Sequence, residues 1–494
     1  MATADNQTRL IHSVSKVGII GAGISGIAAA KQLSGHSPVV FEATDSIGGV
    51  WKHCSYNCTK LQTPRCDFEF SDYPWAERDN SSFPSHLEVL DYLYGYATHF
   101  DVLKYVKFES RVVEIRYVGN DQTTQLPVSV KSGQYGNLLT GHPVWEVAVQ
   151  TSGDPNIIQW YAFEFIVICI GKYGDIPRMP SFPRNKGQEV FKAKSCTPWI
   201  ILSLTTKPLV SSSRARKLQL LATRSQALIW LWSAPRQTKF LHERPNQSLF
   251  RALLCLLSSP MRMAISKFIE SYLVWKLPLV KYGLKPDHPF VEDYASCQMA
   301  ILPESFFAEA EKGKILFKRS PKWWFWNGGI EFEDNTKLEV DVVLLATGYE
   351  GKKKLQSVLP EPFRSLLVDS SGTMPLYRGT IHPLIPNMAF VGFIESVSNL
   401  HTAELRSKWL ARLVDNEFKL PTVQEMLDQI SREMEVMKKT TRFYKRHCIS
   451  TFSINHSDEI CEEMGWKSWR KGNWFSEAFS PYNSRDYCEE ENNN

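Results

Sequence analysis

Long apolar runs are absent from this sequence. A membrane-spanning helix needs about 20 consecutive apolar residues, and a proline and four charged residues break the most apolar region, 249–280: Arg251, Pro260, Arg262, Lys267 and Glu270. The first 16 residues are polar, so they lack the basic start and apolar centre of a signal peptide. We therefore expect a cytoplasmic protein without a transmembrane segment, in which region 249–280 packs against the rest of the chain. Contact of this region with a membrane surface is the alternative.

Paired cysteines and strong net charge are also lacking. The ten cysteines show no paired spacing, which is typical of reduced thiols rather than of a disulfide framework. Cys54 and Cys58 lie close together but without partner ligands, so we expect no metal site. The net charge of +5 is small for 494 residues and the basic residues are scattered, so we expect no nucleic-acid partner.

The first part of the chain has the pattern of a βαβ unit. The apolar run 17–20 is followed by a glycine-rich turn, Gly21-Ala22-Gly23-Ile24-Ser25-Gly26, and by a helix-prone segment, 27–33. A second apolar run, 38–41, ends in Glu42. We expect a strand, a tight turn, a helix and a second parallel strand in this order.

Further elements are predicted by capping and periodicity. Ser85 and Glu88 form a capping-box pattern, which predicts a helix over 87–100. Apolar runs predict strands, which we place at 105–117, 144–149, 157–170 and 340–346.

The glycine-rich turn points to a nucleotide. Glycines let backbone N–H groups approach a pyrophosphate at the positive end of the following helix. Glu42, about 20 residues after the first glycine, can accept hydrogen bonds from ribose hydroxyls and would repel a 2′-phosphate. The pattern therefore predicts FAD or NAD rather than NADP at this first site. A turn that serves only strand–helix packing, with Glu42 as a solvated strand end, is the alternative.

Beyond Glu42 the sequence resembles a known family. Gly48-Gly49-Val50-Trp51 is similar to the FAD fingerprint of flavin-containing monooxygenases and their Baeyer–Villiger relatives. The resemblance extends through several further stretches: Leu61-Gln62-Thr63-Pro64-Arg65, 70–75, 83–86, Gly171-Lys172-Tyr173-Gly174 and Leu345-Ala346-Thr347-Gly348-Tyr349. Segments 240–245, 298–300 and 401–406 look like the plant defence-related branch, whose members N-hydroxylate pipecolate.

The resemblance implies an α/β fold with two Rossmann-like dinucleotide-binding domains, the smaller inserted in the larger. We expect residues 1–186 and 331–480 to form the FAD-binding domain and 187–330 to form a degenerate, shortened NADPH-type domain. The polar, acidic tail, 481–494, is expected to be disordered.

The resemblance also implies the reaction. In this family NADPH reduces FAD, O2 reacts with the reduced flavin, and one oxygen atom passes to a nitrogen or sulfur of a small molecule. Because the cofactor carries this chemistry, no catalytic side chain is expected, and His86 and His401 are interpreted as structural. The expected cofactor-binding residues are Gly21, Ala22, Gly23, Ile24, Ser25, Gly26, Glu42, Gly48, Gly49, Val50, Trp51, Leu61, Gln62, Thr63, Thr347 and Gly348.

The second dinucleotide site departs from the family. No glycine occurs between Gly187 and Gly283, and side chains crowd a backbone that a pyrophosphate must approach. Phe191-Lys192-Ala193 begins the family's identifying motif with Ala in place of its Gly, and the likeness ends at Lys194. Segment 205–237 shows no clear periodicity.

A shifted reading frame restores this part of the family pattern. From Lys194 it can spell the rest of the motif, and over 214–233 it can spell a strand, a glycine turn and a helix. The hypothesis is a base lost near Ala193, with the frame restored near 234–239 and part of the NADPH domain missing. Such a chain would fold poorly and would be an FAD-binding pseudoenzyme or non-functional relic. A divergent but genuine domain and a flavoprotein that has turned to partner binding are the alternatives.

Overall fold

The computed structural model describes residues 11–57, 59–78, 82–119, 138–151, 153–192, 194–196, 218–222, 249–298, 302, 305–367 and 373–488. Its larger sheet contains β1 (Ile11–Ile20), β2 (Val39–Phe41), β3 (Val106–Lys107), β4 (Ser110–Tyr117), β5 (Trp145–Thr151), β6 (Asp154–Ile168) and β13 (Met388–Phe390). The strand order is β3-β2-β1-β6-β5-β4, with β13 also paired to β6. β1 and β2 are parallel and lie side by side, as the βαβ pattern predicts.

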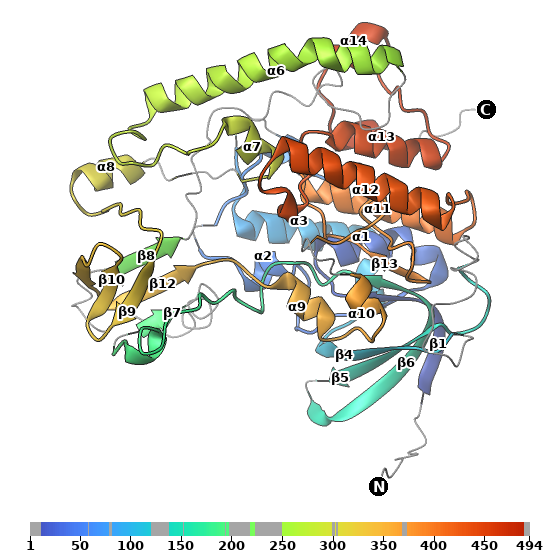
Figure 1. Cartoon of the computed structure of the whole chain (residues 1–494). Coiled ribbons are helices and arrows are strands. Elements are labelled where there is room, and N and C mark those ends of the chain that lie inside the picture. Colours follow the sequence, from blue (N-terminus) through green and yellow to red (C-terminus); the bar gives the residue numbers. More distant parts are fainter. Residues whose placement is uncertain are drawn as a thin grey trace.

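Helices cover one face of this sheet (Figure 1). They are α1 (Ile24–Gln32), α3 (His86–His99), α11 (Asn399–Val414), α12 (Val423–Thr440) and α13 (Ser453–Glu463). On β1, Val17 and Ile19 face the core shared with α1, α3 and α11, whereas Ile20 faces the opposite side. That opposite side packs against α9 (Gly351–Gln356) and α10 (Phe363–Leu366). This alternation follows from the two-residue period of a strand.

Several local predictions are confirmed. Ser85 and Glu88 form the predicted capping box, and α3 follows it. Strands β4, β5 and β6 lie within or close to the predicted ranges, and β1 starts earlier than expected, at Ile11. The remaining described helices outside the middle of the chain are α2 (Val50–His53) and α14 (Trp474–Phe479).

A smaller parallel sheet forms from the middle of the chain and lies to the left of the larger one in Figure 1. Its order is β7-β12-β8, with β7 (Lys194–Cys196), β8 (Leu218–Ala222) and β12 (Val342–Ala346). An antiparallel sheet stands beside it: β9 (Trp323–Trp326), β10 (Gly329–Phe332) and β11 (Lys337–Glu339). The predicted domain boundary put β12 with the larger sheet, but β12 pairs with β7 and β8. The other boundaries stay predictions.

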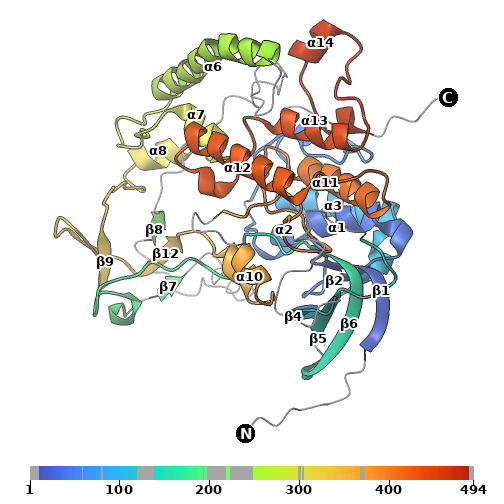
Figure 2. The same cartoon turned by 45° about the vertical axis from the view of Figure 1, so that its right-hand side comes forward.

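The helices of the middle region are α6 (Leu249–Lys276), α7 (Phe290–Ala295) and α8 (Phe306–Glu311). Helix α6 runs along the top of the molecule in Figures 1 and 2. Ile269 and Leu273 are buried, as the packing interpretation expects, whereas Phe268 and Trp275 on the other side are exposed. Among the described residues no helix is long and apolar enough to cross a membrane.

Two expectations from composition are wrong. The tail was expected to be disordered from 481, but residues 481–488 are ordered, with a 3-10 helix at Ser484–Tyr487 and with Tyr482 and Tyr487 buried in the main core. The two aromatic side chains outweigh the polar composition there; residues 489–494 lie outside the described part. Cysteines were expected to be reduced, but Cys297 and Cys448 form a disulfide. They are 151 residues apart, so spacing along the chain could not reveal a pair that only the fold brings together.

Candidate functional site

The turn between β1 and α1 accepts no side chain at two of its glycines. Gly21 has a φ of +100°, and a Cβ there would lie 2.7 Å from the carbonyl oxygen of Cys169. A Cβ on Gly26 would lie 1.8 Å from the carbonyl oxygen of Gly21. The glycines therefore let helix α1 pack directly on the turn.

Gly23 keeps the end of α1 open. It is the N-cap residue, and no side chain caps this helix end. A Cβ on Gly23 would meet nothing closer than the Cα of Gly49, at 3.8 Å. Backbone N–H groups at a helix N-terminus attract anions through their own hydrogen bonds and the helix dipole. The turn is thus suited to a phosphate group.

Glu42 is held beside this turn. Its carboxylate accepts hydrogen bonds from the backbone N–H of Ala22 (2.7 Å) and from the backbone N–H (3.0 Å) and hydroxyl (2.8 Å) of Thr44. The side chain is buried, with 8% of its surface exposed. These bonds fix the carboxylate at the end of β2, where the sequence predicted a group that binds ribose.

The second glycine pair touches the first turn. Gly48 and Gly49 both have positive φ angles, +109° and +54°. A Cβ on Gly49 would lie 3.2 Å from the Cα of Gly23, and the N–H of Gly48 donates to the carbonyl oxygen of Ala22 at 3.1 Å. The two backbones approach closely at Gly49, where a side chain would crowd Gly23, and they form a narrow cradle at the start of α1 and α2.

A cavity of about 600 Å³ opens over this cradle. Most of the predicted cofactor-binding residues line it: Gly21, Gly23, Ile24, Ser25, Glu42, Gly48, Gly49, Val50 and Trp51. Ala22 and Gly26 do not line the cavity. Ala22 is fully buried and its N–H donates to the carboxylate of Glu42, and Gly26 packs against Gly21. The cradle, the carboxylate and the cavity together fit the diphosphate and ribose of FAD.

Besides Ala22 and Gly26, five more predicted site residues do not line the cavity: Leu61, Gln62, Thr63, Thr347 and Gly348. Leu61 is buried in the main core, and its N–H donates to the carbonyl oxygen of Pro84 at 2.8 Å. The hydroxyl of Thr347 donates to the carbonyl oxygen of Arg178, whose own N–H donates to Gly348. The contact of these five residues with a cofactor stays a prediction.

Sequence reasoning missed the wall that comes from the end of β13. Gly392 has a φ of +93°, and a Cβ there would lie 2.3 Å from the hydroxyl oxygen of Ser25. Asn399, Thr402 and Ala403 of α11 line the cavity beside it. An apolar run, 388–391, directly before Gly392 is a strand-then-glycine signal that could have identified this wall.

A buried carboxylate, Glu395, closes the same wall. It pairs with the ammonium group of Lys172 at 2.8 Å and the guanidinium group of Arg446 at 3.0 Å, and it accepts the hydroxyl of Tyr173. Burial alone would raise the pKa of Glu395, but the two cations and the donated hydrogen bonds hold it below its ordinary value. Lys172, Tyr173 and Glu395 all line the cavity. No group of three or more possible metal ligands was found in the described part of the chain.

Comparisons with known proteins agree on one family. The profile of the family described as "Flavin-binding monooxygenase-like" matches residues 14–195 and 210–470. The probable flavin-containing monooxygenase 1 of Arabidopsis thaliana is 55% identical, with 98% of each chain covered. The putative flavin-containing monooxygenase 2 of the same plant is 52% identical over 92% of this chain and 98% of its own.

The first of these alignments spans 523 positions, more than the 494 residues of this chain, so the relative carries residues that this chain lacks.

Solved structures share the fold. An OTEMO complex with FAD and NADP has a TM-score of 0.64 at 17% identity, covering 91% of this chain and 97% of that one. Closed cyclohexanone monooxygenase has a TM-score of 0.61 at 15% identity with the same coverage. S-allyl-L-cysteine S-oxygenase from Allium sativum has a TM-score of 0.53 at 20% identity, covering 92% and 89%. With an α/β fold of this type, a glycine cradle beside Glu42 and a family match over most of its length, the chain belongs to the flavin-containing monooxygenase family.

Proposed function

We propose that this chain binds FAD in the cavity and uses NADPH and O2 to place one oxygen atom on a nitrogen or sulfur of a small molecule. The observation that carries the proposal is the contact of two glycine turns, at Gly23 and Gly49, beside the buried carboxylate of Glu42. The flavin supplies the redox chemistry when it is bound, so we assign no catalytic acid, base or nucleophile to the protein.

The protein's own groups would bind FAD and keep water out of the cavity. The open N-terminus of α1 would hold the diphosphate, and the negative charge of Glu42 favours ribose hydroxyls over a 2′-phosphate. Apolar side chains of Val50, Trp51 and Ile394 line the same cavity and would exclude water from it.

The finer proposal concerns the substrate. The likeness of 240–245, 298–300 and 401–406 to the pipecolate N-hydroxylating branch supports a secondary amine as substrate and a role in plant defence. The polar start and the interrupted apolar runs of the sequence support cytoplasmic action. Sulfur remains a second acceptor atom, because a garlic protein of the same fold is by its name an S-oxygenase. The geometry of the cavity alone selects neither atom.

A second candidate, FAD binding with impaired NADPH use, rests on the sequence of the middle region. β8 ends at Ala222, where a second glycine turn would start, but the chain continues with Thr223-Arg224-Ser225-Gln226. The conformation of these four residues lies outside the described part. The profile match breaks at 196–209, within the segment that the frameshift hypothesis covers. Genomic sequence tests that hypothesis, since codons that cannot spell the family motif in the shifted frame would exclude it.

A turnover assay separates the two candidates. Purified protein is reconstituted with FAD and mixed with a cyclic secondary amine or a thioether. The flavin is reduced either by NADPH or by a chemical reductant before O2 is added. Oxygenated product with both sources supports the full monooxygenase. Product with chemical reduction alone supports a competent flavin site with impaired NADPH use, and protein that never retains FAD refutes both.

A further inference from the structure

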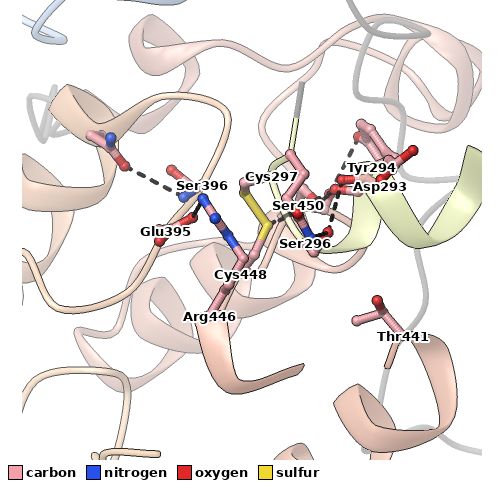
Figure 3. The surroundings of a disulfide bond; sticks show 12 residues. Asp293, Tyr294, Ser296, Cys297, Glu395, Ser396, Thr441, Arg446, Cys448 and Ser450 are labelled. Carbon is pink, nitrogen blue, oxygen red and sulfur yellow. Dashed lines mark hydrogen bonds and ion pairs between the residues drawn. A yellow bond between two sulfur atoms is a disulfide. The ribbon is translucent and has the colours of Figure 1, made fainter. Parts of the chain in front are cut away.

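The disulfide between Cys297 and Cys448 joins two segments that are far apart in the sequence, and Glu395 lies close to it (Figure 3). Cys297 follows helix α7, and Cys448 follows a 3-10 helix at Tyr444–Arg446. Cys448 is buried, with 4% of its surface exposed, whereas Cys297 is only partly buried. A thiol from solution can therefore reach the sulfur of Cys297 more readily than its partner.

Noncovalent contacts hold the same two segments together. The carboxylate of Glu292 on α7 pairs with the guanidinium of Arg442 at 2.9 Å, and the hydroxyl of Thr441 donates to the carbonyl oxygen of Glu292 at 3.2 Å. The hydroxyl of Ser450 donates to the carbonyl oxygen of Tyr294. These bonds do not depend on the sulfur–sulfur bond. They would keep the two cysteines adjacent after reduction, so that the bond can form again.

Cys448 is also coupled to the cavity. The backbone of Glu395 is hydrogen-bonded to the residues before and after Cys448. The N–H of Glu395 donates to the carbonyl oxygen of His447 at 2.9 Å, and the N–H of Ile449 donates to the carbonyl oxygen of Glu395 at 2.8 Å. The carboxylate of Glu395 in turn binds Lys172, and both residues line the cavity. A shift of the Cys448 segment therefore reaches the cavity wall through one residue.

Two free cysteines, Cys54 and Cys66, are poor competitors for this pair. Burial raises the pKa of Cys54 to about 11 and that of Cys66 to about 12, so both thiols are protonated near neutral pH. Because the thiolate is the attacking species, these cysteines do not readily exchange with the disulfide.

We propose that Cys297 and Cys448 are a reversible thiol–disulfide site that tunes the flavin cavity; the coupling to flavin rests on the proposed function. A dithiol reductant supplies the two electrons and two protons. Its first thiolate attacks the sulfur of Cys297 and forms a mixed disulfide, and Cys448 leaves as a thiolate and takes up a proton. The second thiol of the reductant then closes its own disulfide and releases Cys297 as a thiol. The reverse exchange with an oxidised dithiol restores the bond.

The test compares FAD-loaded protein before and after treatment with dithiothreitol. Alkylation and peptide mass spectrometry report whether Cys297 and Cys448 are linked, and flavin fluorescence reports FAD release. We expect both cysteines to be labelled only after reduction, and FAD release to become about tenfold faster, the effect of weakening one charge-assisted hydrogen bond. Cys297→Ser should release FAD at the fast rate without reductant and should not respond to it. Cys66→Ser, outside the pair, should respond like the parent protein.

Each outcome decides one part of the proposal. Unlinked cysteines in air-oxidised protein would overturn the site itself. Linked cysteines whose reduction leaves FAD release unchanged would overturn the coupling. If the protein retains no FAD, the proposed function fails, yet the alkylation pattern and the fall in melting temperature on reduction still confirm or refute the thiol–disulfide site.

Discussion

The strands β1 and β8 both have parallel partners, β1 in the larger mixed sheet and β8 in the smaller sheet, but they end differently. β1 runs into Gly21-Ala22-Gly23, where a side chain on Gly21 would collide with Cys169. β8 pairs with β12 along its whole length, from Leu218 to Ala222, and runs into a sequence without glycine. Strand pairing uses backbone groups that nearly every residue has, whereas a nucleotide turn depends on the absence of Cβ. A strand can thus pair normally even where the sequence after it contains no glycine.

The largest effect is expected from damage to the first turn. In Gly26→Ala the new Cβ would lie 1.8 Å from the carbonyl oxygen of Gly21, so the turn must move. We expect loss of bound FAD and about 3 kcal/mol of stability, measured by flavin absorbance and chemical denaturation. Gly35→Ala is the matched control, because nothing lies within 4 Å of a Cβ there. If Gly26→Ala retained its full flavin content, the first turn would not need glycine at position 26 to bind FAD.

The next test builds a glycine turn after β8. Residues 214–233 are replaced by the strand, turn and helix that the shifted frame spells, S-K-K-V-A-V-I-G-Y-K-K-S-G-I-D-L-A-L-E. Under the second candidate, impaired NADPH use, flavin reduction by NADPH should become about 100-fold faster, a gain of about 2.7 kcal/mol; under the proposed monooxygenase it should not rise. The control is the same replacement with both glycines changed to alanine. Equal rates in the two proteins would show that the turn is not what limits reduction.

A smaller effect is expected at Glu42. Glu42→Ala leaves the N–H groups of Ala22 and Thr44 without their carboxylate and removes the ribose acceptor. FAD affinity should fall about 30-fold, or about 2 kcal/mol, in titrations of the apoprotein. Glu42→Gln keeps an acceptor oxygen for Ala22 and should lose less. An unchanged affinity in Glu42→Ala would leave the glycines alone responsible for binding.

The smallest effect is expected on the stability of the protein at acidic pH. His382, in the FAD part of the chain, is 3% exposed, and burial lowers its pKa to about 4. The folded protein keeps the imidazole ring neutral. The contribution of His382 to the free energy of unfolding is therefore fully present above the ordinary pKa of about 6.5, and it is lost as the pH falls and the unfolded chain binds a proton at this histidine. Between pH 7 and 5 this group should cost about 2 kcal/mol.

Urea midpoints at the two pH values measure the loss. His382→Asn can still accept the N–H of Leu384, which the ring nitrogen accepts at 3.1 Å, but it does not titrate in this range. It should therefore flatten the pH dependence. The same slope in both proteins would assign the acid sensitivity to other groups.

The sequence predicted the strand, turn and helix of the first βα unit and the position of Glu42 after β2, because these depend on residue type and local spacing. It failed where distant segments meet. Glu395 forms ion pairs with Lys172 and Arg446, and Cys297 forms a disulfide with Cys448. All of these partners are far apart in the sequence. The sequence also did not reveal that β12 pairs with β7 and β8, since an isolated apolar run does not say which strands it joins.

Anaerobic mixing of FAD-loaded protein with NADPH, followed by flavin absorbance and a final addition of dithionite, tests the difference between the two turns most directly. The proposed function predicts that NADPH alone bleaches the flavin rapidly, because the chain belongs to a family whose members reduce FAD with NADPH. Flavin that stays oxidised under NADPH and bleaches only with dithionite would contradict the proposed function and would support the second candidate, FAD binding with impaired NADPH use.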